Sequence, residues 1–523
     1  MAEQMDPDGV DERHSRPGVR PIRPWAAVWS MLVGFFMLMI DTLIVSVANP
    51  SIQRELNTSL TATIWVTSAY MLAIAVPLLV AGRLGDRFGQ KTVFMAGMAL
   101  FTVASAACGL SGTITALIMA RVVQGFGAAL MTPQTQAMIV RLFPPDKRGA
   151  PMGVWGSVSG VAMLIAPLAG GFLLDHLGWQ AIFLVNVPIG LIGLVLAGVF
   201  IPRLDGAPAR FDWIGMILSG VGLFLLVFGL QEGSAHHWGR VWGPITIPML
   251  VGTGVAFMAV FVIWEVKGTH CPLVPMRLFA HRDFAVSTAA ISCVRFVSAA
   301  MPLPWLYFLQ LGRGYSGQES AMVMLPSAVI SGVLSPLVGA KLIHRLGSRV
   351  LVPVGSLVWA GGLWWLALLS TDSSALVPWA WVASAVLGVG NSLVWSPLSV
   401  AATAHLPLDE AGAGSSVYNT VGQIGSVVGA AGVTTWMNTR IAAELNRPPA
   451  PVVSDAVAAQ LPHDFSTVEL GDLADLLRID PAVAQWFTGR FASAMGRGMW
   501  LPIAVCVLGA VIAVGLTGRA RRS

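Results

Sequence analysis

The chain has 523 residues, of which 55% are apolar and only 11% are charged, and its formal net charge is +5. Soluble globular domains carry about 25% charged residues, so this composition excludes a water-soluble protein. The apolar residues instead recur in blocks of about 20, the length at which a helix crosses the hydrocarbon core of a bilayer.

Fourteen such blocks follow a polar segment at residues 1–24, which we expect to be a disordered cytoplasmic tail. The blocks begin near Trp25, Thr63, Thr92, Thr113, Met152, Ala181, Trp213, Gly243, Phe284, Glu319, Val350, Ala375, Gly412 and Gly498. An even number of spans places both termini on one side of the membrane. Most lysine and arginine residues fall in the loops of that side, which the positive-inside rule assigns to the cytoplasm.

These features predict a multi-pass protein of a bacterial plasma membrane with both termini cytoplasmic, ending in a basic tail at 519–523. The positive net charge follows from this topology and does not indicate nucleic-acid binding. Residues 437–497 form the longest stretch between spans, and we expect an extracytoplasmic loop there. Amphipathic patterns near 470–477 and 483–491 predict a small helical cap on that loop.

Several kinds of chemistry lack their sequence signatures. The four cysteines are scattered without metal-ligand spacing, so we expect no metal site and no disulfide framework. No Walker-type sequence occurs, and no set of catalytic residues shares one membrane depth, which disfavours an ATP-driven pump and a membrane enzyme. We therefore expect a gradient or a partner to supply the energy, and no cofactor.

Residues 82–91 and 340–349 resemble each other at an offset of 258 positions. Leu84, Arg87, Gly89 and Lys91 correspond to Leu342, Arg345, Gly347 and Arg349. Internal repeats in transporters place the substrate site between the two related halves. The offset predicts an N-terminal six-helix half at 25–202, two inserted helices with an inner linker at 203–283, and a C-terminal six-helix half at 284–518.

The loop at 82–91, with the sequence GRLGDRFGQK, resembles the signature between helices 2 and 3 of the major facilitator superfamily. Nearly the whole chain resembles the fourteen-helix drug:proton antiporters of that superfamily. The resemblance implies an all-α membrane fold of two six-helix halves plus two inserted helices. It also implies alternating-access export of lipophilic drugs or antibiotics in exchange for protons, by a monomer that contacts small lipophilic substrates and membrane lipids. The alternative is a dedicated exporter of one endogenous metabolite, lipid or siderophore.

The resemblance assigns a conformational gate to five residues of this loop: Gly82, Asp86, Arg87, Gly89 and Lys91. Glycines permit a tight turn, and Asp86 can accept hydrogen bonds from donors at a helix N-terminus. The two basic residues would anchor the cytoplasmic face. The alternative is a plain basic loop.

The resemblance also assigns proton coupling to Asp41 in the first span and Arg121 in the fourth. An arginine at membrane depth should face the bundle interior and have a partner. Burial disfavours an ionised carboxylate and an opposing arginine favours it, so Asp41 could load and release protons. The alternatives are a structural hub at Arg121, and an Asp41 that bonds only to hydroxyls such as those of Thr42 or Ser46.

The fifth span resembles the antiporter motif, whose glycines and proline give close packing and a bend. The motif positions are Gly156, Gly160, Pro167, Gly170 and Gly171. Ala166 stands where the family usually has glycine, and Ala48-Asn49-Pro50 replaces the usual Ala-Leu-Pro ending of the first span. Glycine packing without a directional role is the alternative.

Arg295, about a dozen residues into the ninth span, has no role in the family motifs. It could meet an acidic substrate group, a structural partner or the coupling machinery. Seven aromatic residues lie where they could line a substrate cavity, or could instead anchor interfaces or pack: Trp65, Tyr70, Trp155, Trp305, Tyr307, Trp395 and Tyr418. Glu232, Glu265 and Lys341 lie at span ends, where we expect them to reach the membrane interface.

Overall fold

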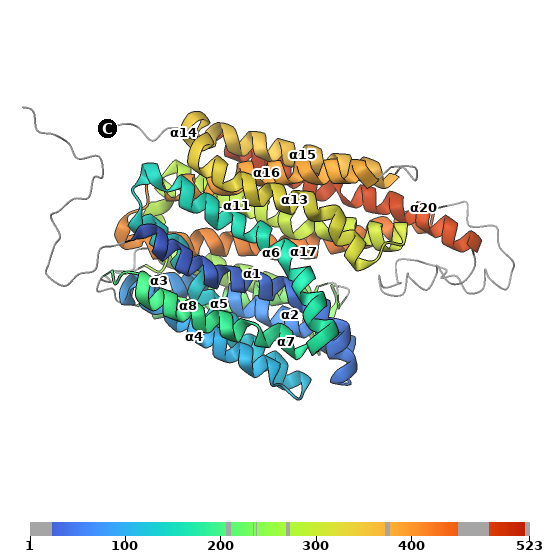
Figure 1. The fold of residues 1–523 in the computed structure, drawn as a ribbon, viewed down its shortest axis with the longest axis horizontal. Coiled ribbons are helices and arrows are strands. Elements are labelled where there is room, and N and C mark those ends of the chain that lie inside the picture. Colours follow the sequence, from blue (N-terminus) through green and yellow to red (C-terminus); the bar gives the residue numbers. More distant parts are fainter. Residues whose placement is uncertain are drawn as a thin grey trace, which may run out of the picture.

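Long apolar helices make up almost all of the described chain. The computed structural model describes residues 23–204, 211–233, 235–236, 238–267, 272–371, 377–447 and 481–517. In lipid every backbone polar group must be satisfied within the protein, and a helix does this within a single segment. Figure 1 shows the result, two bundles of nearly parallel helices lying side by side.

The first bundle is the N-terminal half. Its helices are α1 (Pro24–Glu55), α2 (Leu60–Ala75), α3 (Leu78–Phe88), α4 (Gln90–Gly109), α5 (Ile114–Leu142), η2 (Pro145–Lys147), α6 (Gly149–Leu177), α7 (Gln180–Leu184) and α8 (Asn186–Phe200). The inserted segment has α9 (Trp213–Glu232), β1 (Arg240–Trp242), β2 (Ile245–Thr246), α10 (Ile247–Val266) and η3 (Met276–Ala280). The two short strands pair antiparallel, a hairpin that the sequence did not predict.

The second bundle is the C-terminal half. Its helices are α11 (Arg282–Ala300), α12 (Pro302–Tyr307), η4 (Phe308–Gly312), α13 (Gly317–Leu337), η5 (Val338–Leu342), α14 (Ile343–Leu346), α15 (Ser348–Thr371), α16 (Val377–Thr403), η6 (Leu408–Glu410), α17 (Ala411–Leu445), α20 (Pro481–Gly498) and α21 (Trp500–Ala513).

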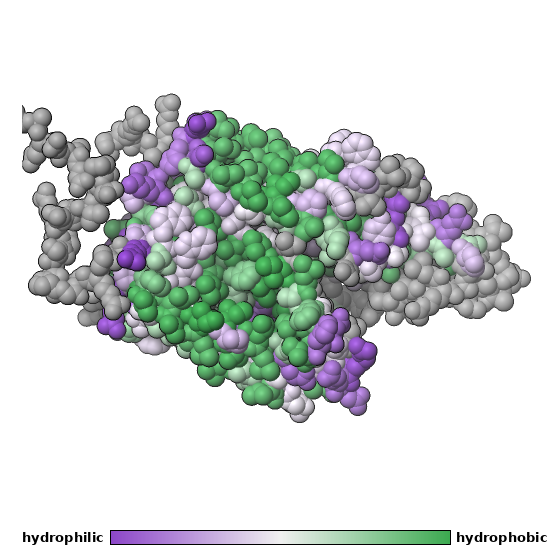
Figure 2. All heavy atoms as spheres, in the orientation of Figure 1, coloured by the Kyte–Doolittle hydropathy of each residue, from purple (hydrophilic) through white to green (hydrophobic). Residues whose placement is uncertain are grey.

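Eleven helices of the described chain are long and apolar enough to cross a membrane. The number is twelve when α2 and α3, which meet at an angle of 47°, count as one bent span. α6 and α17, with 29 and 35 residues, occupy the two remaining predicted spans. The space-filling view in Figure 2 shows hydrophobic residues around the middle of the molecule and hydrophilic residues toward both ends, as a bilayer requires.

The helices extend further into the region of the predicted 437–497 loop than the sequence indicated. α17 continues to Leu445, and α20 begins at Pro481 and leads into α21. The amphipathic pattern at 483–491 belongs to α20, whose Val483, Phe487 and Phe491 are buried in the core of the C-terminal half. This pattern therefore lengthens the last span and does not form a separate cap.

Two glycines at equivalent positions of the predicted repeat adopt similar backbone conformations. The chain breaks between α3 and α4 at Gly89, with φ of 84°, and between α14 and α15 at Gly347, with φ of 72°. Positive φ is accessible to glycine without the steric cost that a Cβ atom brings. α3 and α14 also lie at the same end of the molecule in Figure 1. We call this end, defined by Asp86 and Gly89, the motif end.

The two glutamates of the inserted helices, Glu232 and Glu265, are more buried than the sequence predicted. Glu265 is only 4% exposed, and its Oε1 accepts a hydrogen bond from the backbone N–H of Leu273 at 3.0 Å. Glu232 is buried as well and lies 3.5 Å from His236. The prediction that these side chains reach the interface is wrong for both, because each finds a partner inside the protein. Lys341 is exposed, as expected.

Candidate functional site

Asp41 lies on α1 in the interior of the N-terminal half and is fully buried. Its Oδ2 accepts a hydrogen bond from Arg121 Nη1 at 2.5 Å. Its Oδ1 accepts hydrogen bonds from Gln124 Nε2 and Asn186 Nδ2, both at 2.9 Å. An ionised carboxylate can only accept hydrogen bonds, and all three of these neighbouring groups are donors.

Arg121 is the buried cation of the same network. Its Nε donates to the backbone carbonyl of Val66 at 3.1 Å, and its Nη1 also donates to Gln124 Oε1 at 2.7 Å. The guanidinium lies 3.8 Å from the centroid of the Tyr70 ring, a cation–π distance. Tyr70 is thus buried beneath the arginine rather than exposed to a cavity. The partner that the sequence required for Arg121 is Asp41.

Two members of this network were not predicted as site residues. Gln124 lies one turn after Arg121 on the same face of α5, a spacing that could have signalled it. Asn186 is the first residue of α8. Both side chains also donate to Ser105 Oγ at 3.0 Å, so five helices, α1, α2, α4, α5 and α8, meet at the Asp41 network.

Thr42, one of the alternative partners for Asp41, bonds to its own helix instead. The hydroxyl of Thr42 donates to the backbone carbonyl of Leu38, four residues earlier on the same helix, at 2.8 Å. The side chain of Ser46 lies outside the described residues. The network is instead tertiary, and all of its described members belong to the N-terminal half.

Asp86 joins the two halves at the motif end. Its Oδ1 and Oδ2 accept hydrogen bonds at 2.8 Å from the backbone N–H groups of Gly412 and Ala413, at the N-terminus of α17. Helix N-termini carry a partial positive charge and unpaired N–H groups, so they favour a carboxylate at this position. His344 occupies the equivalent position of the second half, so the repeat supplies a carboxylate on one side only.

The other loop residues support that contact in different ways. Gly82 allows α3 to approach α17, since a Cβ atom there would lie 2.4 Å from the carbonyl oxygen of Gly412. The Arg87 guanidinium lies 4.3 Å from the ring centroid of Phe211, just before α9. Lys91 donates to the carbonyls of Gly198 and Ile201 at 2.7 and 2.6 Å, at the C-terminal end of α8.

A second contact between the halves runs along α6 and α13. A Cβ atom on Gly149 would lie 2.1 Å from the carbonyl oxygen of Gly339, and one on Gly153 would lie 2.7 Å from that of Ser335. The glycines of the predicted bend are looser: Gly160 would place a Cβ 3.1 Å from the Ala328 carbonyl, and Gly156 has its nearest neighbour at 3.9 Å. Close packing is therefore strongest toward the motif end.

The rest of the antiporter motif lies beyond this contact. Gly171 has no atom within 4 Å of its added Cβ. Gly170 is buried, and the side chain of Pro167 lies outside the described residues, although α6 continues through that position. The α6–α13 contact and the Asp86 contact together close the motif end in this conformation.

Two more arginines bind across the halves at that end. Arg141 Nε donates to the Leu408 carbonyl at 3.0 Å, and Arg148 donates to the Thr403 carbonyl. Thr403 is the last residue of α16, and Leu408 lies in η6, between α16 and α17. Arg148 also donates to the carbonyls of Phe143 and Val140, which fixes its direction.

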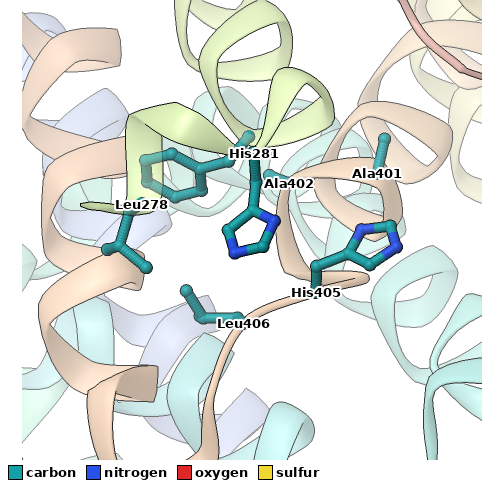
Figure 3. Close-up of a pocket in the computed structure, with 7 residues that line it drawn as sticks. Leu278, His281, Ala401, Ala402, His405 and Leu406 are labelled. Atoms are coloured by element: carbon teal, nitrogen blue, oxygen red, sulfur yellow. The ribbon is translucent and has the colours of Figure 1, made fainter. Parts of the chain in front are cut away.

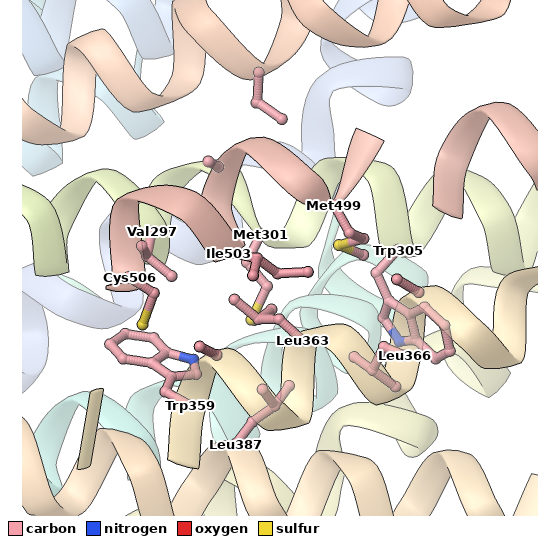
Figure 4. Close-up of a cluster of buried hydrophobic side chains, with 14 of the residues drawn as sticks. Val297, Met301, Trp305, Trp359, Leu363, Leu366, Leu387, Met499, Ile503 and Cys506 are labelled. Atoms are coloured by element: carbon pink, nitrogen blue, oxygen red, sulfur yellow. The ribbon is translucent and has the colours of Figure 1, made fainter. Parts of the chain in front are cut away.

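The predicted aromatic wall divides into packing residues and partly exposed residues. Trp305 is 1% exposed and belongs to the apolar core of the C-terminal half shown in Figure 4, so it packs rather than lines a cavity. Tyr418 is also buried, 3.4 Å from Ser399 Oγ. Tyr307 and Trp395 keep part of their surface. Trp155 of α6 is buried with its ring centroid 6.5 Å from that of Trp395.

Arg295 faces the junction of the halves. Its Nη2 donates to Asn419 Oδ1 at 3.2 Å, and its guanidinium lies 5.1 Å from the Trp395 ring centroid. Asn419 in turn donates to Gln136 Oε1 on α5 at 3.0 Å. The arginine therefore contacts the N-terminal half through one intervening side chain.

A pocket at the junction of η3, α11 and α16 does not serve as a drug site. It is lined by His281 and His405, whose rings stack at 5.9 Å, and by the apolar side chains seen in Figure 3. Its cavity volume is about 10 Å³, far below the roughly 300–1,000 Å³ of sites for drug-sized ligands.

Comparison with known proteins decides the family. The sequence profile of the Major Facilitator Superfamily matches residues 31–430. The chain belongs to this superfamily. An uncharacterized MFS-type transporter of Mycobacterium tuberculosis strain H37Rv is 43% identical over 495 residues, which cover 94% of this chain and 81% of that protein. The tetracenomycin C resistance and export protein of Streptomyces glaucescens is 34% identical, with 80% and 77% covered.

Other relatives are named as multidrug resistance proteins and multidrug transporters, which places this major facilitator in the drug-exporter branch. The solved structure of the proton:xylose symporter XylE has the same fold, with a TM-score of 0.56 at 13% identity over 91% of this chain and 95% of that one. The protein is therefore a multi-pass membrane transporter and not an enzyme.

Proposed function

We propose that this major facilitator exports lipophilic drugs or antibiotics in exchange for protons, by alternating access between its two halves. The observation that carries the proposal is Asp41, a carboxylate at membrane depth held by Arg121, Gln124 and Asn186. The relatives named for drug resistance and antibiotic export support the substrate class. Protons are the coupling ion, and no other cofactor is needed.

Proton coupling follows from the hydrogen bonds around Asp41. Protonation would remove the charge that attracts Arg121 and place a donor where three donors already converge. The network must then rearrange, and Arg121 must find other acceptors. Because the network joins five helices of the N-terminal half, such a rearrangement changes how these helices pack. Proton uptake thus favours a different arrangement of the half that it occupies.

The gate and the antiporter motif set the direction of access. With Asp86 bound to α17 and α6 packed on α13, the motif end is closed. We assign the motif end to the cytoplasm of a bacterium, because short loops retain lysine and arginine there. In this assignment both termini are cytoplasmic, and the structure represents a state closed toward the cytoplasm. The transporter acts as a monomer surrounded by lipid, with no nucleic-acid partner.

The experiment is dye export from a host that lacks its own efflux pumps. Cells would carry wild-type protein, Asp41→Asn or the control Glu232→Gln, which changes a buried carboxylate outside the Asp41 network. Efflux of a fluorescent lipophilic dye is followed with and without an uncoupler, at matched protein levels in the membrane.

We expect wild type and Glu232→Gln to export the dye until the uncoupler is added, and Asp41→Asn to export none. Export that persists with the uncoupler would refute proton coupling. Normal export by Asp41→Asn would remove Asp41 from the mechanism. If correctly inserted wild type moves no lipophilic dye, the narrow metabolite exporter becomes the better hypothesis.

A further inference from the structure

Arg295 is a cation without a carboxylate partner in the interior of a membrane protein. Among the described residues it forms no ion pair, and its guanidinium donates to an amide oxygen and lies near an indole ring. The helices packed around it, α5, α6, α11, α16 and α17, carry three acidic residues, Asp175, Asp283 and Glu444. All three lie near helix ends, and Asp283, 12 positions before Arg295, is about 18 Å away along α11.

The surroundings hold the arginine in place while leaving its charge uncompensated. A Cβ atom on Gly422 of α17 would lie 3.2 Å from both Arg295 Cγ and Nε, so the side chain lies flat against this glycine. Part of Arg295 and part of Trp395 remain exposed at the junction of the halves. An unpaired charge at membrane depth is costly, and such residues commonly mark the path or site of a charged ligand.

The hydrogen bonds around Arg295 form a relay in which each side chain donates to the next, from Arg295 to Asn419 and from Asn419 to Gln136. Arginine can only donate, so Asn419 must turn its oxygen toward Arg295 Nη2. The amide nitrogen of Asn419 then donates to Gln136 Oε1 at 3.0 Å. The remaining group of Gln136 is its NH₂, which has no described partner. The relay therefore presents further N–H donors, and no acceptor, at the junction.

Three donors of this region lack partners among the described residues: Arg295 Nε, Gln136 Nε2 and Trp155 Nε1. Trp155 belongs to the same region through the 6.5 Å contact of its ring with Trp395, which lies against the arginine. Buried N–H groups are nearly always satisfied, because leaving one unpaired costs about 1–3 kcal/mol. Unpaired donors next to an uncompensated cation suit an acceptor-rich, negatively charged ligand.

We propose that Arg295, Gln136 and Trp155 form a binding site for the anionic group of an aromatic substrate, with Trp395 against its ring system. This inference rests on the export function proposed above and specifies its substrate class as lipophilic aromatic acids, such as carboxylates, sulfonates or ionised phenols. The site draws Gln136 and Trp155 from the N-terminal half and Arg295 and Trp395 from the C-terminal half. Alternating access would therefore take the site apart and rebuild it.

The site discriminates by charge. An anion would bond to Arg295 by charge-assisted hydrogen bonds, which are stronger than neutral ones. A lipophilic cation would meet the uncompensated guanidinium and be repelled, while a neutral aromatic compound would gain only the contact with the indole rings.

The test compares two probes that share one ring system, 1-anilinonaphthalene-8-sulfonate and N-phenyl-1-naphthylamine, which lacks the sulfonate. Binding to full-length protein in lipid nanodiscs is measured by titration calorimetry, with empty nanodiscs subtracted. The variants are Arg295→Gln, Asn419→Asp and the control Arg440→Gln. Arg440 also lies over a tryptophan, 3.8 Å from the Trp436 ring centroid, but about 30 Å along α17 from Asn419.

We expect wild type to bind the sulfonate at least about tenfold more tightly than the neutral probe, the scale of a charge-assisted hydrogen bond. Arg295→Gln removes this preference by deleting the cation, and Asn419→Asp removes it by neutralising an intact arginine. Asn419→Asp keeps a hydrogen-bond partner for Arg295, so it tests the proposal even if Arg295→Gln fails to fold. Arg440→Gln leaves both affinities unchanged.

Equal binding of the two probes by wild type would overturn the proposal, as would a sulfonate preference that survives in Asn419→Asp. No proton gradient is present in the binding measurement. Charge-selective binding without uncoupler-sensitive dye export would thus keep the anion site and refute proton-driven export, whereas the reverse result would keep export and refute the site.

Discussion

The Asp86 contact allows a quantitative prediction about the gate. The change Asp86→Asn keeps the size of the side chain and removes its charge. The carbonyl oxygen of the new amide can accept from one of the two α17 N–H groups, while its NH₂ faces the other donor. The substitution therefore replaces two charge-assisted hydrogen bonds with one neutral bond and one unsatisfied N–H.

The loss can be estimated from these bonds. Charge-assisted hydrogen bonds contribute about 1.5–3 kcal/mol each and neutral ones about 0.5–1.5 kcal/mol. The attraction of the carboxylate to the α17 N-terminus adds a few tenths to about 1 kcal/mol. We expect the closed motif end to lose about 3 kcal/mol relative to the open one, which shifts the equilibrium between them about 100-fold.

The assay measures the distance across the motif end by electron–electron double resonance. Spin labels would replace the exposed residues Lys147 on η2 and Asp409 on η6, in a protein whose four cysteines are changed to serine. Asp86→Asn should add a population at longer distance. The control His344→Asn changes the equivalent position of the second half, which is exposed, and should leave the distribution as in wild type. An unchanged distribution for Asp86→Asn, or equal opening by the control, would refute the reasoning.

Three further predictions address packing and coupling. Gly149→Ala should open the motif end in the same distance measurement, because its Cβ would lie 2.1 Å from a backbone oxygen of η5, whereas Gly171→Ala meets nothing and should have no effect. Asn186→Ala removes one donor to the buried carboxylate of α1, so uncoupler-sensitive dye export should fall, while Asn391→Ala in the other half leaves it unchanged. Trp305→Ala should lower the free energy of unfolding by about 3 kcal/mol or more, seen as a lower Tm in detergent, without changing the affinity for either probe.

The sequence was sufficient for the spans, the repeat and the residues with unusual chemistry. A bilayer requires each span to be a self-contained apolar helix, so local composition shows where the spans lie. For the same reason Asp41, Arg121 and Arg295 are conspicuous within apolar blocks. The glycine at each chain break can also be recognised from the local sequence, because Gly89 and Gly347 both adopt positive φ, which glycine favours.

Tertiary structure decided which of these residues meet. Gln124 and Asn186 are ordinary polar residues in sequence, and only the convergence of five helices makes them donors to Asp41. In the same way, the aromatic residues predicted to line a cavity separated into core residues such as Trp305 and partly exposed residues such as Trp395.

Tertiary contacts also determined where the helices of the 437–497 region end and whether the Glu265 side chain is buried. α20 is amphipathic, and its apolar face is buried because α15 and α17 cover it. Glu265 stays inside because the linker after α10 offers a backbone N–H. The sequence by itself therefore determined a membrane transporter built from two related halves, because span length, glycine conformation and buried charge are local properties. The tertiary structure decided which donor reaches which acceptor, because those contacts join residues far apart along the chain. Asp86 and its two donors on α17, for example, are separated by more than 300 positions.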